Sequence, residues 1–206
     1  MNRPPHIAIV RVETVPMEML FDFVRDVEAD GLRLSVESRP DPGPMAGIEW
    51  LLLPAVFVYL GKSYTDGFLK EMGKDHYIAL KGGLQSLHKK FFGPTAPAVT
   101  LFGTIGKVRP DPPFSLVFSI LAEGGDGLTI KLLIARQASA AEYEATVEAF
   151  LEFVDRFHGG ALDDETVESL RGARVIGRTL LVAYNAASQR IEPVDSMAKD
   201  KTHGVA

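Results

Sequence analysis

The most distinctive hydrophobic pattern in the chain is an uncharged apolar run that passes directly into a polar, basic stretch. The run covers residues 50–60 (WLLLPAVFVYL), and a stretch with helical spacing follows over residues 61–92. The run is shorter than the roughly 18–20 apolar residues that span a bilayer. It must therefore be buried in a core, against a partner, or shallowly in a membrane surface. We predict a helix with a kink or break at Pro54, and the alternative is a buried strand because Val56 and Val58 are β-branched.

The pattern before this run predicts a strand, a helix and a second strand. Residues 7–13 are β-branched and alternate toward their end, which is typical of a strand. Apolar residues then recur every three or four positions up to Val27, and Gly31 is the expected stop. Residues 32–38 alternate, with Leu32, Leu34 and Val36 expected to point inward.

The basic stretch predicts two helices, residues 63–72 and 75–91, that are divided near Gly73. Asp75 is a favourable N-cap residue for the second helix. The apolar stripe of that helix consists of Tyr77, Leu80, Leu84, Leu87 and Phe91. Gly82 and Gly83 interrupt the stripe, which indicates close backbone packing or a bend.

The second half of the chain is mainly β-patterned and contains one long helix. The helix is predicted over residues 140–158, because Ser139 and Glu142 have the spacing of a capping box and Gly159-Gly160 follows. A Gly-Gly-Asp-Gly sequence indicates a hairpin turn. The remaining elements are an acidic helix over 163–170 and strands over 98–108, 114–122, 128–135, 179–184 and 190–194.

Together these elements predict an α+β protein. A β-α-β start (residues 1–43) leads into a helical insertion (44–93), and an antiparallel sheet with one long amphipathic helix packed on it follows (94–206). We expect the three segments to form one composite domain. Hydrophobic residues make up 46% of the 206 residues and charged residues 24%, which is ordinary for a globular protein and excludes a wholly disordered chain.

Charge narrows the classes of partner. The net charge of −5 argues against a dedicated nucleic-acid binder. Residues 61–92 hold six lysines and three acids, whereas residues 139–172 hold nine acids and two arginines. If the protein forms a homo-oligomer, these two segments are the expected complementary surfaces. The chain has no cysteine and no secretory signal pattern, so we expect a cytoplasmic protein, peripheral to a membrane if the basic stretch binds lipid.

Catalytic motifs are weak. Residues 103–107 (GTIGK) lack the spacing of a phosphate-binding loop, no Gly-x-Ser-x-Gly sequence occurs, and the histidines are scattered, so we expect neither a metal nor a cofactor. The alternative to a binding protein is an enzyme of unrecognised type with a polar cleft around residues 62–81. His76 would then be a general base, whereas the simpler interpretation is a surface histidine on a capped helix. The candidate catalytic residues are Lys62, Tyr64, Asp66, Lys70, His76 and Tyr77.

Our principal hypothesis is a non-enzymatic interaction module. The apolar and basic helices of residues 48–92 would meet a protein partner or an anionic membrane surface. The alternative is that the lysines only complement the dipole of their own helix. The candidate contact residues are Lys81, His88, Lys89, Lys90, Phe91 and Phe92.

Overall fold

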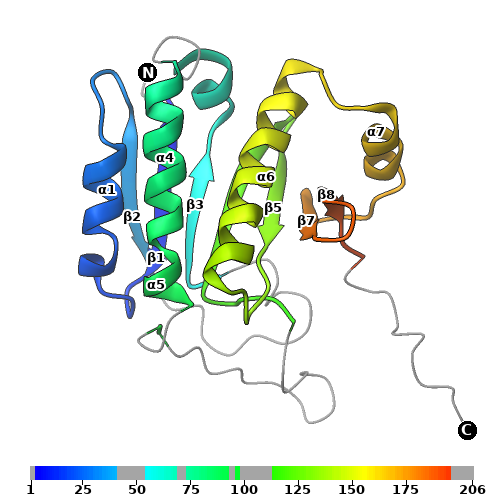
Figure 1. The fold of residues 1–206 in the computed structure, drawn as a ribbon. Helices are drawn as coiled ribbons and strands as arrows, with labels where there is room; N and C mark the ends of the chain where they lie inside the picture. Colours follow the sequence, from blue (N-terminus) through cyan, green and yellow to red (C-terminus); the bar gives the residue numbers. More distant parts are fainter. Residues whose placement is uncertain (1–2, 41–53, 69–72, 93–95, 98–112, 196–206) are drawn as a thin grey trace, which may run out of the picture.

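A single sheet runs through the protein. The computed structural model describes residues 3–40, 54–68, 73–92, 96–97 and 113–195 (Figure 1). Within these residues, eight strands form one sheet in the order β2-β1-β3-β4-β5-β7-β6, and β8 also pairs with β7. The mixed α and β content agrees with the predicted α+β class. The strands are β1 (Ile7–Val12), β2 (Leu34–Arg39), β3 (Val56–Leu60), β4 (Phe118–Gly125), β5 (Leu128–Leu133), β6 (Val175–Ile176), β7 (Thr179–Asn185) and β8 (Arg190–Pro193).

The sheet is mixed, so the prediction of an antiparallel sheet over residues 94–206 is wrong for one strand pair, β5 and β7. β1 and β2, β3 and β4, and β5 and β7 are parallel neighbours. A helical crossover joins the two strands of each pair, which returns the chain in the same direction. The joints between these units, β1 with β3 and β4 with β5, are antiparallel, as are the pairs that β7 forms with β6 and β8. Alternation of apolar residues does not reveal strand direction, which is why the sequence pattern missed this arrangement.

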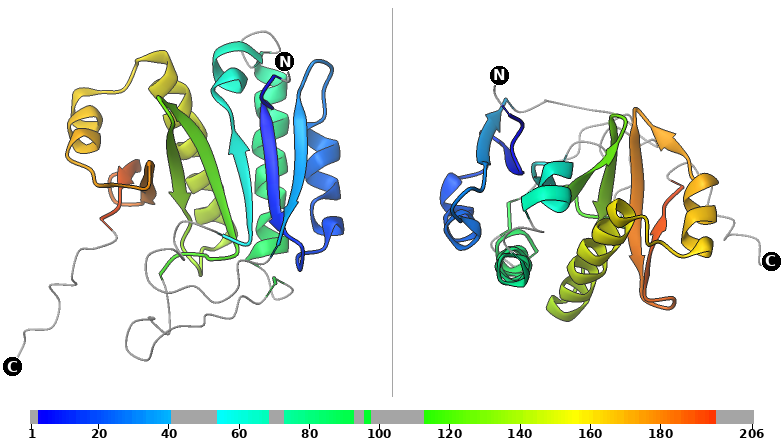
Figure 2. Two further views of the ribbon diagram at one scale, coloured as in Figure 1. Left: turned by 180° about the vertical axis from the view of Figure 1, so that it is seen from behind. Right: turned by 90° about the horizontal axis from the view of Figure 1, so that it is seen from above.

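The crossover helices form one layer on one face of the sheet. Figures 1 and 2 show α1, α4 and α6 side by side against the strands. The helical elements are η1 (Met17–Met19), α1 (Phe21–Val27), η2 (Tyr64–Phe68), α4 (Lys74–Ser86), α5 (His88–Phe91), α6 (Ala140–Gly159) and α7 (Asp164–Arg171). The hydrophobic core lies between this layer and the sheet.

The described part of the apolar run is a strand, not a helix. Val56, Val58 and Leu60 of β3 are buried and alternate with half-buried residues. β3 lies between β1 and β4, so strands from all three predicted segments share one sheet. The β-branched residues suit this position because they pack well on a pleated surface. Residues 48–53 lie outside the described part, as do residues 69–72 and the predicted strand over 98–108.

Helix α4 differs from its prediction at both ends. It begins after Gly73, and Asp75 lies exposed in the first turn, so the prediction of Asp75 as N-cap is wrong. It ends at Ser86, and the short α5 follows after Leu87. The expected close packing is confirmed at Gly83, where a Cβ atom would lie 3.0 Å from Phe23 Cδ2 of α1.

Local signals in the second half predicted its elements well. The capping box of α6 is confirmed, because the Ser139 backbone N–H donates to Glu142 Oε2 at 2.8 Å and the Ser139 hydroxyl accepts from the Glu142 backbone. Gly160 ends the helix with φ 66°. The two hairpins, β4 with β5 and β7 with β8, are also confirmed.

In the first half, Val36 is 40% exposed on the edge strand β2, so its expected inward position is wrong.

Candidate interaction surface

Two of the candidate catalytic residues, Tyr64 and His76, form a buried hydrogen-bonded pair. His76 Nε2 lies 2.9 Å from the Val27 carbonyl oxygen, which can only accept, so Nε2 carries the proton. Nδ1 therefore accepts a hydrogen bond from the Tyr64 hydroxyl at 3.0 Å. His76 is only 6% exposed, so the interpretation as a surface histidine is wrong. Both ring nitrogens are satisfied, and the pair ties α4 to α1 and η2.

The other candidate catalytic residues lie in different environments. Lys62 and Asp66 form an exposed ion pair of 3.7 Å. Tyr77 lies on the side of α4 that faces α6, where burial raises its pKa and the carboxylates of Glu148, Glu152 and Asp155 raise it further. Lys70 lies outside the described residues. Lys62 and Asp66 thus lie apart from the buried Tyr64–His76 pair, whereas Tyr77 is near enough to Tyr64 to help raise the pKa of its hydroxyl. This division does not favour a centre shared by all of these residues.

The aromatic members of the predicted contact set are packed inside the protein. Phe91 is 2% exposed and stacks on Phe118 of β4, with ring centroids 5.1 Å apart. His88 donates from Nε2 to the Ala138 carbonyl at 2.9 Å, and its ring stacks on the half-buried Phe92. Phe91 therefore belongs to the core, and His88 is half-buried with its Nε2 bonded to Ala138. Their contact with a partner stays a prediction. The burial of Phe91 fits the apolar stripe that the sequence predicts for this helix, whereas the packing of His88 on Phe92 depends on the tertiary structure.

The lysines of this set do reach the surface. Lys89 is exposed, Lys90 lies 3.5 Å from Asp22 of α1, and Lys81 Nζ lies 2.5 Å from Glu148 Oε1 of α6. These ion pairs join neighbouring helices at partly exposed positions, where such pairs contribute about 0–1 kcal/mol to stability.

Two large apolar side chains on the helix layer are exposed. Ile78 of α4 and Phe21 of α1 are each 54% exposed. Lys74, Ile78, Lys81 and Lys89 recur at helical spacing on the outer side of α4 and α5, and we call these four residues the basic face. The sequence pattern did not single out Ile78 and Phe21. A signal for them exists, because each is a large apolar residue that lies off the buried stripe of its helix.

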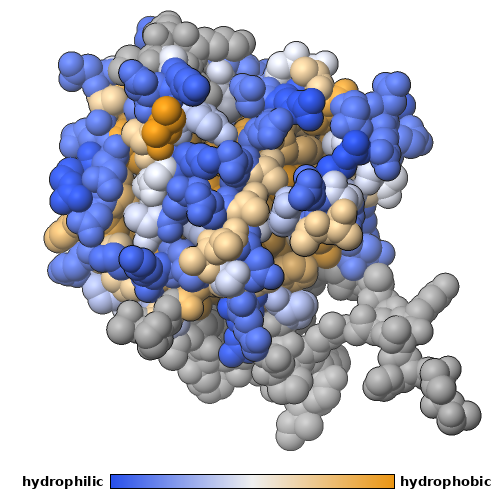
Figure 3. All heavy atoms as spheres, in the orientation of Figure 1, coloured by the Kyte–Doolittle hydropathy of each residue, from blue (hydrophilic) through white to orange (hydrophobic). Residues whose placement is uncertain are grey.

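An acidic surface lies directly beside the basic face. Glu144, Glu148, Glu152 and Asp155 are exposed along α6, and we call these residues the acidic row. Figure 3 shows this side of the molecule as mostly hydrophilic, with a pale apolar band along α6. Small residues, Ala141, Ala145 and Ala149, recur every fourth position there. The helix layer therefore carries opposite charges on two adjacent helices.

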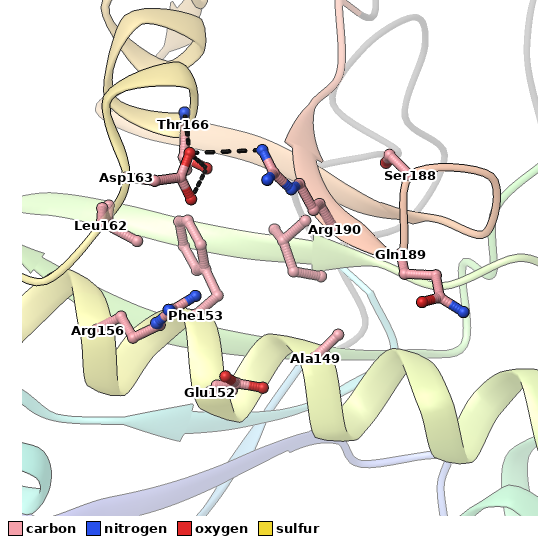
Figure 4. A pocket seen from close by; sticks show the side chains of 11 residues that line it. Ala149, Glu152, Phe153, Arg156, Leu162, Asp163, Thr166, Ser188, Gln189 and Arg190 are labelled. Atoms are coloured by element: carbon pink, nitrogen blue, oxygen red, sulfur yellow. Dashed lines mark hydrogen bonds and ion pairs between the residues drawn. The ribbon is translucent and has the colours of Figure 1, made fainter.

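A groove of about 460 Å³ lies between α6, α7 and β8 (Figure 4). Phe153 and Ile191 supply apolar lining, and both are buried. Arg190 lies 3.4 Å from Asp163 and 2.6 Å from Glu165. Backbone donation from Thr166 is the main cause of the lowered pKa of Asp163. Two charged lining residues, Asp163 and Arg190, thus bind each other or adjacent residues and hold α7 against β8.

Comparison with known proteins does not assign the chain to a family. No family model matches the chain, and neither the curated proteins nor the solved structures contain a match. Among the described residues, no three metal-ligating side chains form a group that could hold an ion. In the same part of the chain, no helix is long and apolar enough to cross a membrane.

Proposed function

We propose that the chain is a non-enzymatic interaction module whose basic face meets an acidic surface of a protein partner. The observation that carries the proposal is the exposure of Ile78 between Lys74 and Lys81 on α4. A large apolar side chain flanked by two lysines resembles the centre and rim of a small protein interface. Helix α6 lies beside this surface, with its buried apolar residues toward the sheet and its acidic residues toward solvent.

A protein partner fits the described surface better than an anionic membrane. Membrane binding through a few lysines contributes only about 1 kcal/mol for each lysine and needs apolar side chains that insert. Phe91 and three residues of the apolar run, Val56, Val58 and Leu60, are buried in the core. Ile78 and Phe21 alone offer little area for insertion, whereas a protein surface can enclose them and pair with the lysines.

A titration followed by NMR tests the proposal. The probe is a synthetic peptide of glutamate and leucine, which presents the acidic and apolar chemistry of the proposed partner. We expect the amide signals of α4 and α5 to shift, and Ile78→Ser to weaken binding about tenfold, which corresponds to roughly 1.4 kcal/mol. Val175→Ser is the matched control, since Val175 is 48% exposed on β6, away from this face.

Two results would count against the proposal. The first is a peptide that shifts no signals, or that shifts signals elsewhere on the molecule. The second is binding to vesicles of anionic lipid without binding to the peptide, which would replace the protein partner with a membrane surface. Vesicles of neutral lipid serve as the control for charge.

A further inference from the structure

The contacts between α4 and α6 place their charges at matching heights. Helix α4 connects the parallel strands β3 and β4, and α6 lies between the parallel strands β5 and β7. Because β4 and β5 are antiparallel, the two helices run in opposite directions. Lys81 meets Glu148, and the Tyr143 hydroxyl donates to the Leu84 carbonyl at 2.8 Å. Seven residues from the first contact, about 10 Å along each helix, Lys74 and Asp155 therefore lie at the same level. Likewise Gln85 lies level with Glu144.

This arrangement is complementary to itself. Consider a two-fold axis parallel to both helices that lies outside the molecule, over the seam between them. Rotation about such an axis keeps every residue at its own level and places α4 of one copy opposite α6 of the other. Lys74 then faces Asp155 of the second copy and Lys81 faces Glu148 of the second copy, and each contact occurs twice. Such a contact is closed, because a two-fold interface uses the same surface on both subunits.

The side chains along the seam permit a close approach. Gly82 lies exposed on α4, and a Cβ atom there would meet nothing within 4 Å. Ala141 and Ala145 line the outer side of α6, and Ile78 provides an apolar contact near the middle of the face. Among the described residues, the structure gives no ion pair for Lys74 or Asp155, so both remain available to a second copy.

From these observations we infer that the partner of the basic face is a second copy of this chain, bound as a two-fold dimer with α4 of each copy on α6 of the other. The inference rests on the proposed function, because it names the occupant of the same surface. Two adjacent helices of this length bury on the order of 1,000 Å² in total, which is at the low end for specific interfaces. The dimer is therefore weak, and salt weakens it further because its charges lie near the solvent.

Sedimentation velocity over a range of protein concentrations tests the dimer, at about 0.01 M and about 1 M salt, where the screening length falls from about 30 Å to about 3 Å. We expect a concentration-dependent dimer at low salt. Lys74→Asp and Asp155→Lys should each weaken dimerisation at least about tenfold, because each reversal turns two attractive contacts into repulsive ones. Arg171→Asp, which changes an exposed side chain on α7 by the same charge, is the matched control.

Mixing the two reversed variants gives the decisive measurement. Lys74→Asp and Asp155→Lys chains should dimerise with each other about as well as the natural chain dimerises with itself, because both contacts become attractive again. The double variant should also recover. Circular dichroism of each variant checks that its fold is retained. A mixture that stays monomeric, or a dimer that none of these substitutions weakens, overturns the two-fold arrangement.

The failure of this inference can be distinguished from the failure of the proposed function. If the natural chain stays monomeric at low salt while the acidic peptide still binds α4, the second copy is the wrong partner and the module remains. If the chain neither dimerises nor binds the peptide, both the inference and the proposed function are wrong.

Discussion

At the residue scale, hydrogen-bond capacity decides the role of His76. A buried imidazole with one ring nitrogen unpaired would be costly, and a catalytic base would need that nitrogen to face a substrate. Here Nε2 donates to Val27 and Nδ1 accepts from Tyr64. The pair therefore acts as a structural link between helices that lie far apart in the sequence.

Replacement of the Tyr64 hydroxyl tests this structural role. Tyr64→Phe leaves the shape of the ring and removes the donor to His76 Nδ1, so a buried acceptor loses its partner. We expect the free energy of unfolding to fall by about 1–3 kcal/mol. Urea unfolding gives the value, and Tyr184→Phe, which alters a half-buried tyrosine of β7, is the control. No change in stability for Tyr64→Phe would contradict the structural role.

A second buried polar residue lies on the opposite face of the sheet. Lys131 of β5 is 2% exposed and alternates with Ile130 and Leu132, which belong to the core under the helices. Burial, together with the charge of Arg39, lowers the pKa of Lys131 to about 7. An unfolded chain keeps a lysine protonated up to a pKa of about 10.4.

The lowered pKa of Lys131 makes stability depend on pH in a defined direction. Between pH 7 and about pH 10 the unfolded chain binds a proton at Lys131 that the folded chain lacks, so this group's contribution to stability rises with pH. We expect Lys131→Met to remove this part of the rise in stability. The measurement is the free energy of unfolding in urea at the lower and the upper end of this pH range. Lys89→Met, at an exposed site, should keep this part of the rise. Identical pH profiles for the natural chain and Lys131→Met would show the assignment to be wrong.

At the element scale, the two adjacent glycines of α4 serve different purposes. The Cβ of an alanine at Gly83 would meet Phe23 at 3.0 Å and Val27 at 3.2 Å, both on α1. At Gly82 the same atom would meet nothing within 4 Å. Sequence spacing indicated close packing or a bend but did not show which glycine was responsible, because that depends on where α1 lies.

This difference predicts opposite effects for the same substitution. Gly82→Ala should stabilise the protein by up to about 1 kcal/mol, since alanine is the better helix former. Gly83→Ala should destabilise it by about 1–3 kcal/mol through overpacking against α1, less the gain in helix propensity. Thermal unfolding of the two variants side by side is a direct measurement. If Gly83→Ala stabilised the protein as much as Gly82→Ala, the close approach of α4 to α1 would be refuted.

At the scale of the whole molecule, the sheet connects segments that are distant in the sequence. β3 pairs in parallel with β4, although more than fifty residues separate their register partners Val56 and Phe118. β3 also pairs with β1, so its hydrophobic residues contribute to a core that both halves share. A break in the chain between β3 and β4 would expose an edge on each half.

This connection predicts that the halves do not fold separately. Fragments 1–97 and 98–206, expressed individually, should give NMR spectra with poorly dispersed amide signals. They should also lack a cooperative thermal transition, because each exposes an unpaired strand with its apolar face. Mixing the fragments should restore at least part of the dispersion. If either fragment alone unfolded cooperatively, the chain would contain two independent units, and the sequence-based expectation of one composite domain would be wrong.

What the sequence by itself determined is local. The start of α6 at Ser139 and the hairpin between β4 and β5 depend on hydrogen bonds and turn conformations within a few residues, and the pattern shows these directly. The basic and acidic segments were also visible as composition. Their positions side by side on α4 and α6 were not, because that depends on which helix crosses beside which.

Only the tertiary structure decided the state of β3, the direction of the strand pairs and the burial of His76. A short apolar run is compatible with a helix or with a buried strand. Here the neighbouring strands β1 and β4 pair with it through hydrogen bonds, and the run forms a strand. The same reason separates contact residues from core residues: Phe91 meets Phe118, whereas Ile78, two positions from the buried His76 and Leu80 of the same α4, meets solvent.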